Sequence, residues 1–160
     1  MEHIWSPWRM NYIMSHEHKD GCIFCDALQS PDNPENLIVY RGEKSFVILN
    51  RYPYTNGHLM VVPIAHIPSI ELLEQETCIE LMQLITTSIK VLRSVYTPEG
   101  FNVGTNIGDV AGAGVASHVH FHIVPRWAGD TNFMTTTGMV RVLPEELCQT
   151  YERIVKAWNS

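Results

Sequence analysis

The chain has 160 residues, 45% of them apolar, and its 17 Asp and Glu against 11 Lys and Arg give a formal net charge of −6. This length suits a single domain over residues 1–160 that buries a core without disulfide bonds, and the apolar fraction excludes a disordered chain. No apolar run approaches the roughly 18 residues of a membrane helix, and an acidic chain without a Lys/Arg cluster is unsuited to wrapping a nucleic acid duplex. We therefore expect neither a membrane nor a nucleic acid as a partner.

The first 20 residues are rich in aromatic side chains, and we expect them to form an arm outside the core. The opening, residues 1–5, lacks the basic segment followed by an apolar one that marks a secretory signal. Four cysteines in a chain of this length without such a signal do not indicate a disulfide framework. These features predict a cytoplasmic protein in which Cys78 and Cys148, both within helical patterns, fill core space.

Beyond the arm, short apolar segments between turns predict strands, and apolar residues at spacings of three and four predict helices. A core over residues 37–127 is followed by a C-terminal helix. This order predicts an α+β fold: a mostly antiparallel five-stranded sheet with one long helix and the C-terminal helix. The expected elements are, in chain order, strands 37–40, 46–50 and 59–62, a helix from about 70 to 96, strands 101–107 and 117–124, and a helix over 143–159.

The segment over 117–124 carries three histidines in five residues, at positions 118, 120 and 122. Side chains alternate along a strand, so the three imidazoles are expected on one face, about 6.6 Å apart, and the apolar residues between them on the other. The apolar face should contact the core, which leaves the histidine face to a cleft or to solvent. A solvated face normally carries Thr, Lys or Glu, so this pattern indicates a functional site.

Two functions fit three imidazoles on one face. They could form a metal cage, or one could act as a nucleophile while the other two place and neutralise an anion. The loop over 106–114, rich in Gly and Ala, precedes the strand, and such loops let backbone N–H groups approach phosphate oxygens. The loop favours the nucleophile.

The segment 118–124, His-φ-His-φ-His-φ-φ with φ apolar, resembles the motif of the histidine triad (HIT) family. Residues 46–51 and 57–63 resemble the nucleotide-binding hairpin of that family. The chain also resembles one branch of the family, which contains bacterial diadenosine tetraphosphate hydrolases and phosphorylases. This resemblance lies in residues 4–10, 125–127 and 129–134. The resemblance covers nearly the whole chain and implies a HIT-like fold.

The resemblance implies that the middle histidine attacks the α-phosphorus of a nucleotide and forms a nucleotidyl-histidine intermediate. A neutral imidazole suits this role when its other ring nitrogen donates to a fixed acceptor, which in the family is a backbone carbonyl of the same strand. The other triad histidines and a histidine after the hairpin border the site. The implied catalytic residues are His120, His122, His118 and His58, and the implied nucleotide-binding residues are Asn50 for ribose and Asn106, Gly114 and Ser117 for phosphate.

The pair Cys22 and Cys25 has the C-x-x-C spacing of structural zinc sites. A redox-active pair is the alternative, but such pairs lie at a strand-to-helix junction of a βαβ unit, which the pattern does not predict here. In many bacterial relatives that resemble this chain, two histidines complete a zinc site, and the matching positions are His66 and His118. We therefore expect structural Zn²⁺, and Mg²⁺ could accompany a polyphosphate substrate.

The resemblance predicts an enzyme that cleaves dinucleoside polyphosphates at the α-phosphate in two steps. Water as acceptor makes it a hydrolase, and inorganic phosphate makes it a phosphorylase. Histidine at position 122, where relatives such as galactose-1-phosphate uridylyltransferases carry Gln, favours hydrolysis. A phosphorylase, a nucleoside phosphoramidase and a nucleotide-binding module without catalysis are the alternatives. The resemblance also implies a homodimer, for which Trp5, Trp8 and Trp158 are candidate interface residues or covers of the core.

Overall fold

The computed structural model describes residues 21–130 and 145–160. The predicted aromatic arm over 1–20, with Trp5 and Trp8, lies outside the described residues. So do positions 131–134 of the family-like motif and the predicted helix start at 143–144. Among the described residues, no helix is long and apolar enough to cross a membrane.

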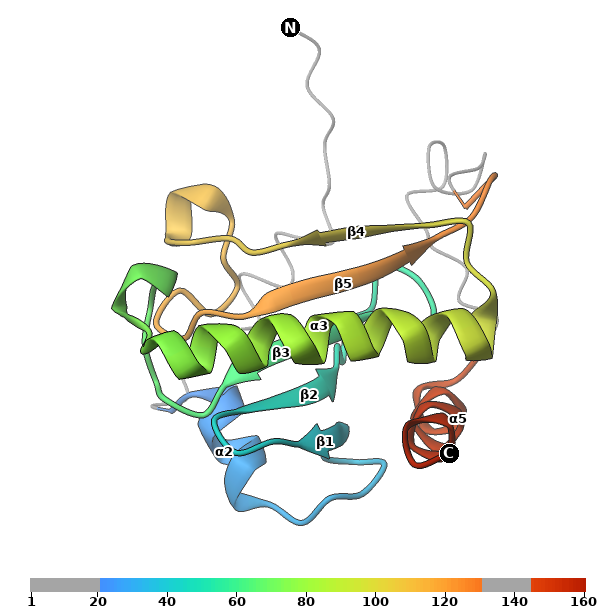
Figure 1. Ribbon diagram of the computed structural model, residues 1–160, viewed down its shortest axis with the longest axis horizontal. Coiled ribbons are helices and arrows are strands. Elements are labelled where there is room, and N and C mark those ends of the chain that lie inside the picture. Colours follow the sequence, from blue (N-terminus) through green and yellow to red (C-terminus); the bar gives the residue numbers. More distant parts are fainter. Residues whose placement is uncertain (1–20, 131–144) are drawn as a thin grey trace, which may run out of the picture.

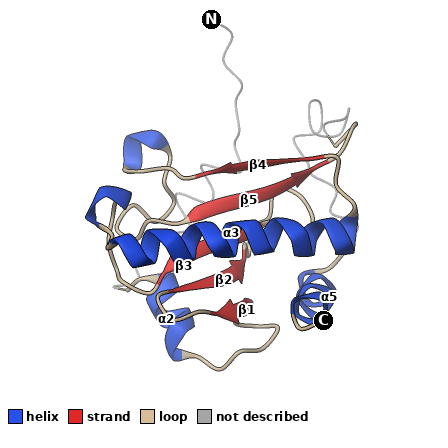
Figure 2. Cartoon of the chain, viewed as in Figure 1, coloured by secondary structure: helices blue, strands red, loops and turns tan. Residues whose placement is uncertain are grey.

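The described chain forms one five-stranded sheet in the order β1-β2-β3-β5-β4 (Figures 1 and 2). Every neighbouring pair is antiparallel, which confirms the predicted α+β fold. β2 and β3 lie inside the sheet and are buried along their whole length, as expected for continuous apolar segments. The strands are β1 (Ile38–Arg41), β2 (Ser45–Leu49), β3 (Leu59–Pro63), β4 (Gly100–Gly104) and β5 (Phe121–Arg126).

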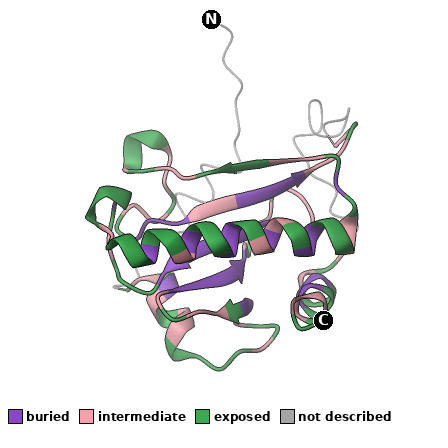
Figure 3. Cartoon of the chain, viewed as in Figure 1, coloured by how far each residue is buried: buried purple, intermediate pink, exposed green. Residues whose placement is uncertain are grey.

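One long helix, α3 (Gln75–Tyr96), follows a single 3-10 turn, η1 (Ile70–Leu72), and lies across the sheet (Figure 1). Its buried side faces the strands and its other side is exposed (Figure 3). Leu81, Leu84, Ile85 and Leu92 are buried on that side, which confirms the predicted periodicity. The helix ends at Tyr96, and the next residue, Thr97, caps it in a left-handed conformation.

Two shorter helices complete the described part. α5 (Leu147–Trp158) begins with a capping box between Glu146 and Gln149, and its Trp158 stacks on Tyr40 of β1 with ring centroids 5.2 Å apart. That aromatic residue therefore covers the core of its own chain. The other helix, α2 (Ile23–Gln29), was not predicted, because seven residues contain too few turns to show a helical period.

The strand that carries the triad starts later and ends later than predicted. β5 begins at Phe121, since that residue is the first to pair with β3, whereas Val119 N–H donates to the carbonyl oxygen of Ile67 outside the sheet. It continues through Pro125 because Pro125 pairs with β4 on one side while the ladder with β3 has already ended. A proline lacking N–H is tolerated at such an unpaired side. His118 and His120 therefore precede the strand.

Two further predictions need correction. Cys78 on α3 and Cys148 on α5 are exposed and fill no core space. β4 ends at Gly104, so residues 105–107 of the predicted strand belong to the loop before η2 (Asp109–Ala111). Both errors arise because helical periodicity assigns faces only approximately, and strand ends depend on pairing partners that the local sequence does not reveal.

Candidate active site and metal-binding group

The three triad histidines alternate with apolar residues as expected; His122 lines a cleft, whereas the other two are covered. His118 and His120 are 0% and 4% exposed, and Val119 on the other face is also buried. The ring of Phe24 on α2 lies 5.4 Å from His118 and 4.9 Å from His120, measured between centroids. Phe24 of the unpredicted helix α2 thus packs against both of these histidines.

The middle histidine, His120, is held in one tautomer. Its Nδ1 lies 2.9 Å from the backbone carbonyl oxygen of His118. A carbonyl oxygen only accepts hydrogen bonds, so Nδ1 carries the proton and Nε2 keeps a free lone pair. Burial lowers the pKa of His120, while the bond to the carbonyl opposes this shift. Thr105 Oγ1 donates to the His120 carbonyl oxygen at 2.7 Å and further fixes the backbone.

The last triad histidine, His122, is hydrogen-bonded to His58, which lies in the turn just before β3. His58 Nε2 lies 2.9 Å from His122 Nδ1, and the fully buried His58 is bonded in turn to Asn50. The ring of Tyr54, a residue that no sequence motif indicated, packs against both histidines. Its centroid lies 4.7 Å from that of the His58 ring and 6.2 Å from that of the His122 ring. His58, His122 and Tyr54 therefore form one packed aromatic cluster.

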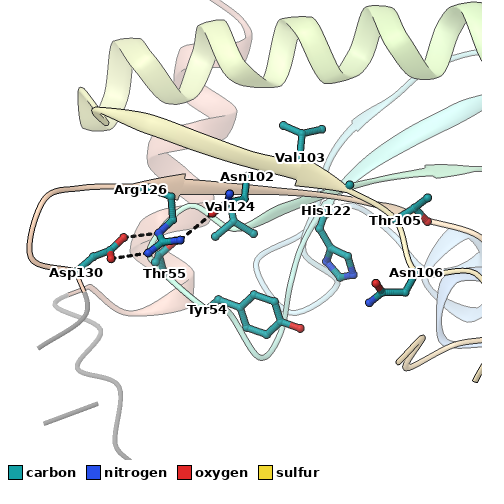
Figure 4. A pocket seen from close by; sticks show the side chains of 11 residues that line it. Tyr54, Thr55, Asn102, Val103, Thr105, Asn106, His122, Val124, Arg126 and Asp130 are labelled. Atoms are coloured by element: carbon teal, nitrogen blue, oxygen red, sulfur yellow. Dashed lines mark hydrogen bonds and ion pairs between the residues drawn. The ribbon is translucent and has the colours of Figure 1, made fainter. Parts of the chain in front are cut away.

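A cleft of about 350 Å³ lies beside this cluster (Figure 4). His122 and Asn106 lie together at one end of it. At the other end Arg126 makes a bidentate ion pair with Asp130 and donates to Asn102. Of the predicted site residues, only His122 and Asn106 line this cleft; Gly114 and Ser117 are exposed elsewhere, His58 and His120 are buried, and Asn50 is half-buried.

Two of the four cysteines and two of the histidines form a compact group that could hold a metal ion. The ligand atoms of Cys22, Cys25, His66 and His118 all lie within 4.8 Å of one another. Cys22 Sγ is 3.2 Å from His118 Nδ1, and Cys25 Sγ is 3.3 Å from His66 Nδ1. Tetrahedral zinc with N and S ligands requires separations of roughly 3.3 to 3.8 Å between ligand atoms. The three separations of 3.2, 3.3 and 3.7 Å between cysteine sulfurs and histidine nitrogens lie close to this range.

The protonation of this group also suits a cation. His118 Nε2 donates to the carbonyl oxygen of Pro63 at 2.8 Å, so the lone pair on Nδ1 faces the thiols. Burial, followed by the neighbouring Cys22, raises the pKa of the Cys25 thiol. A divalent cation offsets both effects by binding the thiolates. The Pro63 carbonyl is a supporting partner that the sequence did not indicate.

We expect acid to destabilise the fold through His122. Burial, followed by the charge of His120, lowers the pKa of His122 to about 4, whereas an unfolded histidine titrates near 6.5. As pH falls from about 6.5 to about 4, the unfolded chain takes up the proton first, so the free energy of unfolding decreases by up to roughly 3 kcal/mol.

Urea unfolding at pH 7 and pH 4.5 measures this effect in the wild type and in a His122→Gln variant. All other titrating groups are shared, so the wild type should lose more stability than the variant. An equal loss in the two proteins would show that His122 titrates normally.

The chain matches the family model for the HIT domain over residues 31–129. AP-4-A phosphorylase of Mycobacterium tuberculosis is 39% identical over 166 aligned residues, covering 99% of this chain and 85% of the relative. Adenosine 5'-monophosphoramidase of Schizosaccharomyces pombe is 32% identical over 106 residues, covering 66% of this chain and 74% of the relative.

Solved structures show the same fold. A histidine triad nucleotide-binding protein from Sulfolobus tokodaii superposes with a TM-score of 0.69 at 27% identity, covering 86% of this chain and 92% of that one. A zinc-bound histidine triad family protein from Mycobacterium smegmatis also has a TM-score of 0.69, at 24% identity, covering 87% and 94%. The triad motif, the family model and the similarity along the whole chain agree, and the chain belongs to the histidine triad (HIT) family.

Proposed function

We propose that the protein is a nucleotidyl-transferring enzyme that cleaves dinucleoside polyphosphates at the α-phosphate, with His120 as the nucleophile. The observation that carries this proposal is the bond from His120 Nδ1 to the His118 carbonyl, which leaves the lone pair of the ring on Nε2. In the first step Nε2 forms a bond to the α-phosphorus. The bond from that phosphorus to the bridging oxygen breaks, and its electron pair leaves with the remaining phosphate chain.

The residues at the His122 end of the cleft would stabilise charge on the phosphate oxygens. His122 and the side chain of Asn106 line that end, and both offer N–H donors. Positioning and electrostatic stabilisation dominate phosphoryl transfer, so neutral donors in a partly buried cleft suit this task. In the second step an acceptor oxygen attacks the phosphorus and His120 Nε2 is released.

The acceptor determines the class of reaction, and each candidate has its own support. Histidine at position 122 favours water. Similarity to the M. tuberculosis AP-4-A phosphorylase over 99% of the chain favours inorganic phosphate. Similarity to the S. pombe adenosine 5'-monophosphoramidase supports a phosphoramidate substrate as the alternative.

The products from diadenosine tetraphosphate, separated by ion-exchange chromatography with and without inorganic phosphate and with and without Mg²⁺, test this proposal. Hydrolysis at the α-phosphate yields AMP and ATP under both phosphate conditions. Phosphorolysis yields ADP and ATP and requires phosphate. Absence of turnover and of acid-labile label on the protein, for this substrate and for an adenosine phosphoramidate, would instead favour a nucleotide-binding module.

We propose that zinc occupies the group formed by Cys22, Cys25, His66 and His118. The ligand separations and the lone-pair orientation of His118 support this assignment. The ion would have a structural role, because four protein ligands leave no open coordination position. It would join α2 to the segment that carries the nucleophile.

We also propose that the protein forms a homodimer through β4. This strand lies at the edge of the sheet, and Val103 on it is 45% exposed. An exposed edge strand presents N–H and C=O groups that pair readily with a second chain. Light scattering after size-exclusion chromatography measures the mass, and a value near 18.2 kDa would contradict the dimer.

A further inference from the structure

His58 receives hydrogen bonds from donors whose direction is fixed. The backbone N–H of Tyr54 donates to His58 Nδ1 at 3.1 Å, and a backbone N–H can only donate. The side-chain Nδ2 of Asn50 approaches the same ring nitrogen at 3.3 Å. Because two donors converge on Nδ1, this nitrogen must carry a lone pair, and the proton of the neutral His58 ring resides on Nε2.

The orientation of the Asn50 amide is also fixed. Its Oδ1 accepts a hydrogen bond from the backbone N–H of Tyr52 at 2.9 Å. This contact requires an oxygen, so the amide nitrogen must be the atom that faces His58. Two backbone N–H groups, at positions 52 and 54, thus determine the direction of the hydrogen bonds from Asn50 to His58 and from His58 to His122.

The tautomer of His58 in turn determines the tautomer of the third triad histidine, His122. His58 Nε2 donates to His122 Nδ1 at 2.9 Å, so the proton of a neutral His122 resides on Nε2. A second proton on His122 would place two N–H groups against each other, and burial likewise lowers the pKa of His122 to about 4. With Nδ1 occupied by His58, Nε2–H is the ring donor that His122 can offer in the cleft that it lines.

We propose that Asn50 is a positioning residue that, through His58, holds His122 in the tautomer whose Nε2–H donates to the substrate phosphate. The proposal rests on the proposed function, since it takes an α-phosphate as the ligand of His122. It assigns Asn50 a role other than the ribose contact implied by family resemblance. Both polar atoms of the Asn50 side chain already bond within the protein.

The arrangement also makes His122 a hydrogen-bond donor and not a general acid. His122 Nδ1 accepts a hydrogen bond from His58, so the neutral ring holds a single proton, on Nε2. The departing phosphate chain is stable as an anion and needs no proton. The electron pair of the broken P–O bond remains on its oxygen while the His122 proton stays on Nε2.

The tautomers can be observed directly. Long-range ¹H–¹⁵N correlation spectra of the wild-type protein distinguish protonated from unprotonated ring nitrogens. We expect His58 and His122 both to be protonated at Nε2 and unprotonated at Nδ1. A proton on His58 Nδ1 would overturn the proposal, whether or not the protein turns over a nucleotide, so this measurement is independent of the proposed function.

An Asn50→Asp variant tests the effect on catalysis with little change of shape. The carboxylate retains the acceptor for the Tyr52 N–H but replaces the donor to His58 by a second acceptor. A carboxylate oxygen facing His58 Nδ1 favours a proton on that nitrogen and competes with the Tyr54 N–H, so the donor that His122 offers is weakened. We expect kcat/KM with diadenosine tetraphosphate to fall by about 10²-fold, the usual effect of losing one such donor.

An Asn50→Ala variant should be affected less, by about tenfold or less, because the Tyr54 N–H still directs His58. A ribose contact or a purely structural turn predicts the opposite order, since Asp preserves acceptors that Ala removes. Asn159→Asp, at the exposed C-terminal end of α5, controls for the added charge and should match the wild type. If Asn50→Ala is more impaired than Asn50→Asp, the proposal is wrong.

Discussion

Replacing His120 with alanine is expected to abolish nucleotidyl transfer, with kcat for diadenosine tetraphosphate falling by at least roughly 10⁴-fold. The reason is chemical: Nε2 of this ring forms the bond to phosphorus in the proposed first step, and alanine offers no substitute. Acid-labile label from a radiolabelled dinucleotide should be trapped on the wild type by rapid quenching and should be absent from the variant.

The metal content and melting temperature of the same variant provide its control. His120 is not among the four residues of the metal-binding group, so both should remain close to those of the wild type. This result would exclude the metal cage of three triad histidines. Loss of metal from His120→Ala, or residual turnover within tenfold of the wild type, would contradict the assigned nucleophile.

Removing the proposed zinc ion is expected to destabilise the fold strongly. Cys22 and Cys25 lie more than 40 residues from His66 and more than 90 from His118, so the ion would join distant segments. Binding free energies of structural zinc sites are several kcal/mol or more, so a Cys25→Ser variant or a chelator should lower the melting temperature by about 10 °C or more. Calorimetry together with metal analysis measures both quantities.

Cys148→Ser is the matched control, because Cys148 is exposed and lies outside the metal-binding group. It should retain metal, stability and turnover. Catalysis should fall in Cys25→Ser along with stability, because the His118 carbonyl that orients His120 belongs to a residue of the proposed metal site. If Cys25→Ser and Cys148→Ser behave alike in metal content and stability, the structural metal site is excluded.

Much of the fold follows from the sequence, because long segments show their period. The apolar spacing along α3 and the apolar segments of β2 and β3 are strong local signals, and they predicted the helix and the two central strands. The short helix α2 and the late start of β5 show no such signal. Seven residues define no helical period, and the start of a strand depends on where its partner strand begins.

At the site, too, some features follow from the sequence and others from the tertiary structure. The sequence alone determined which residue types are available, because the triad spacing and the C-x-x-C pair are local patterns, and family resemblance added His58 and His66. Only the tertiary structure decided their proton arrangement: the His118 carbonyl directs His120, the Pro63 carbonyl directs His118, and backbone N–H groups direct His58. A tautomer is set by the atom that faces each ring nitrogen, and for His118 that atom comes from a residue 55 positions away.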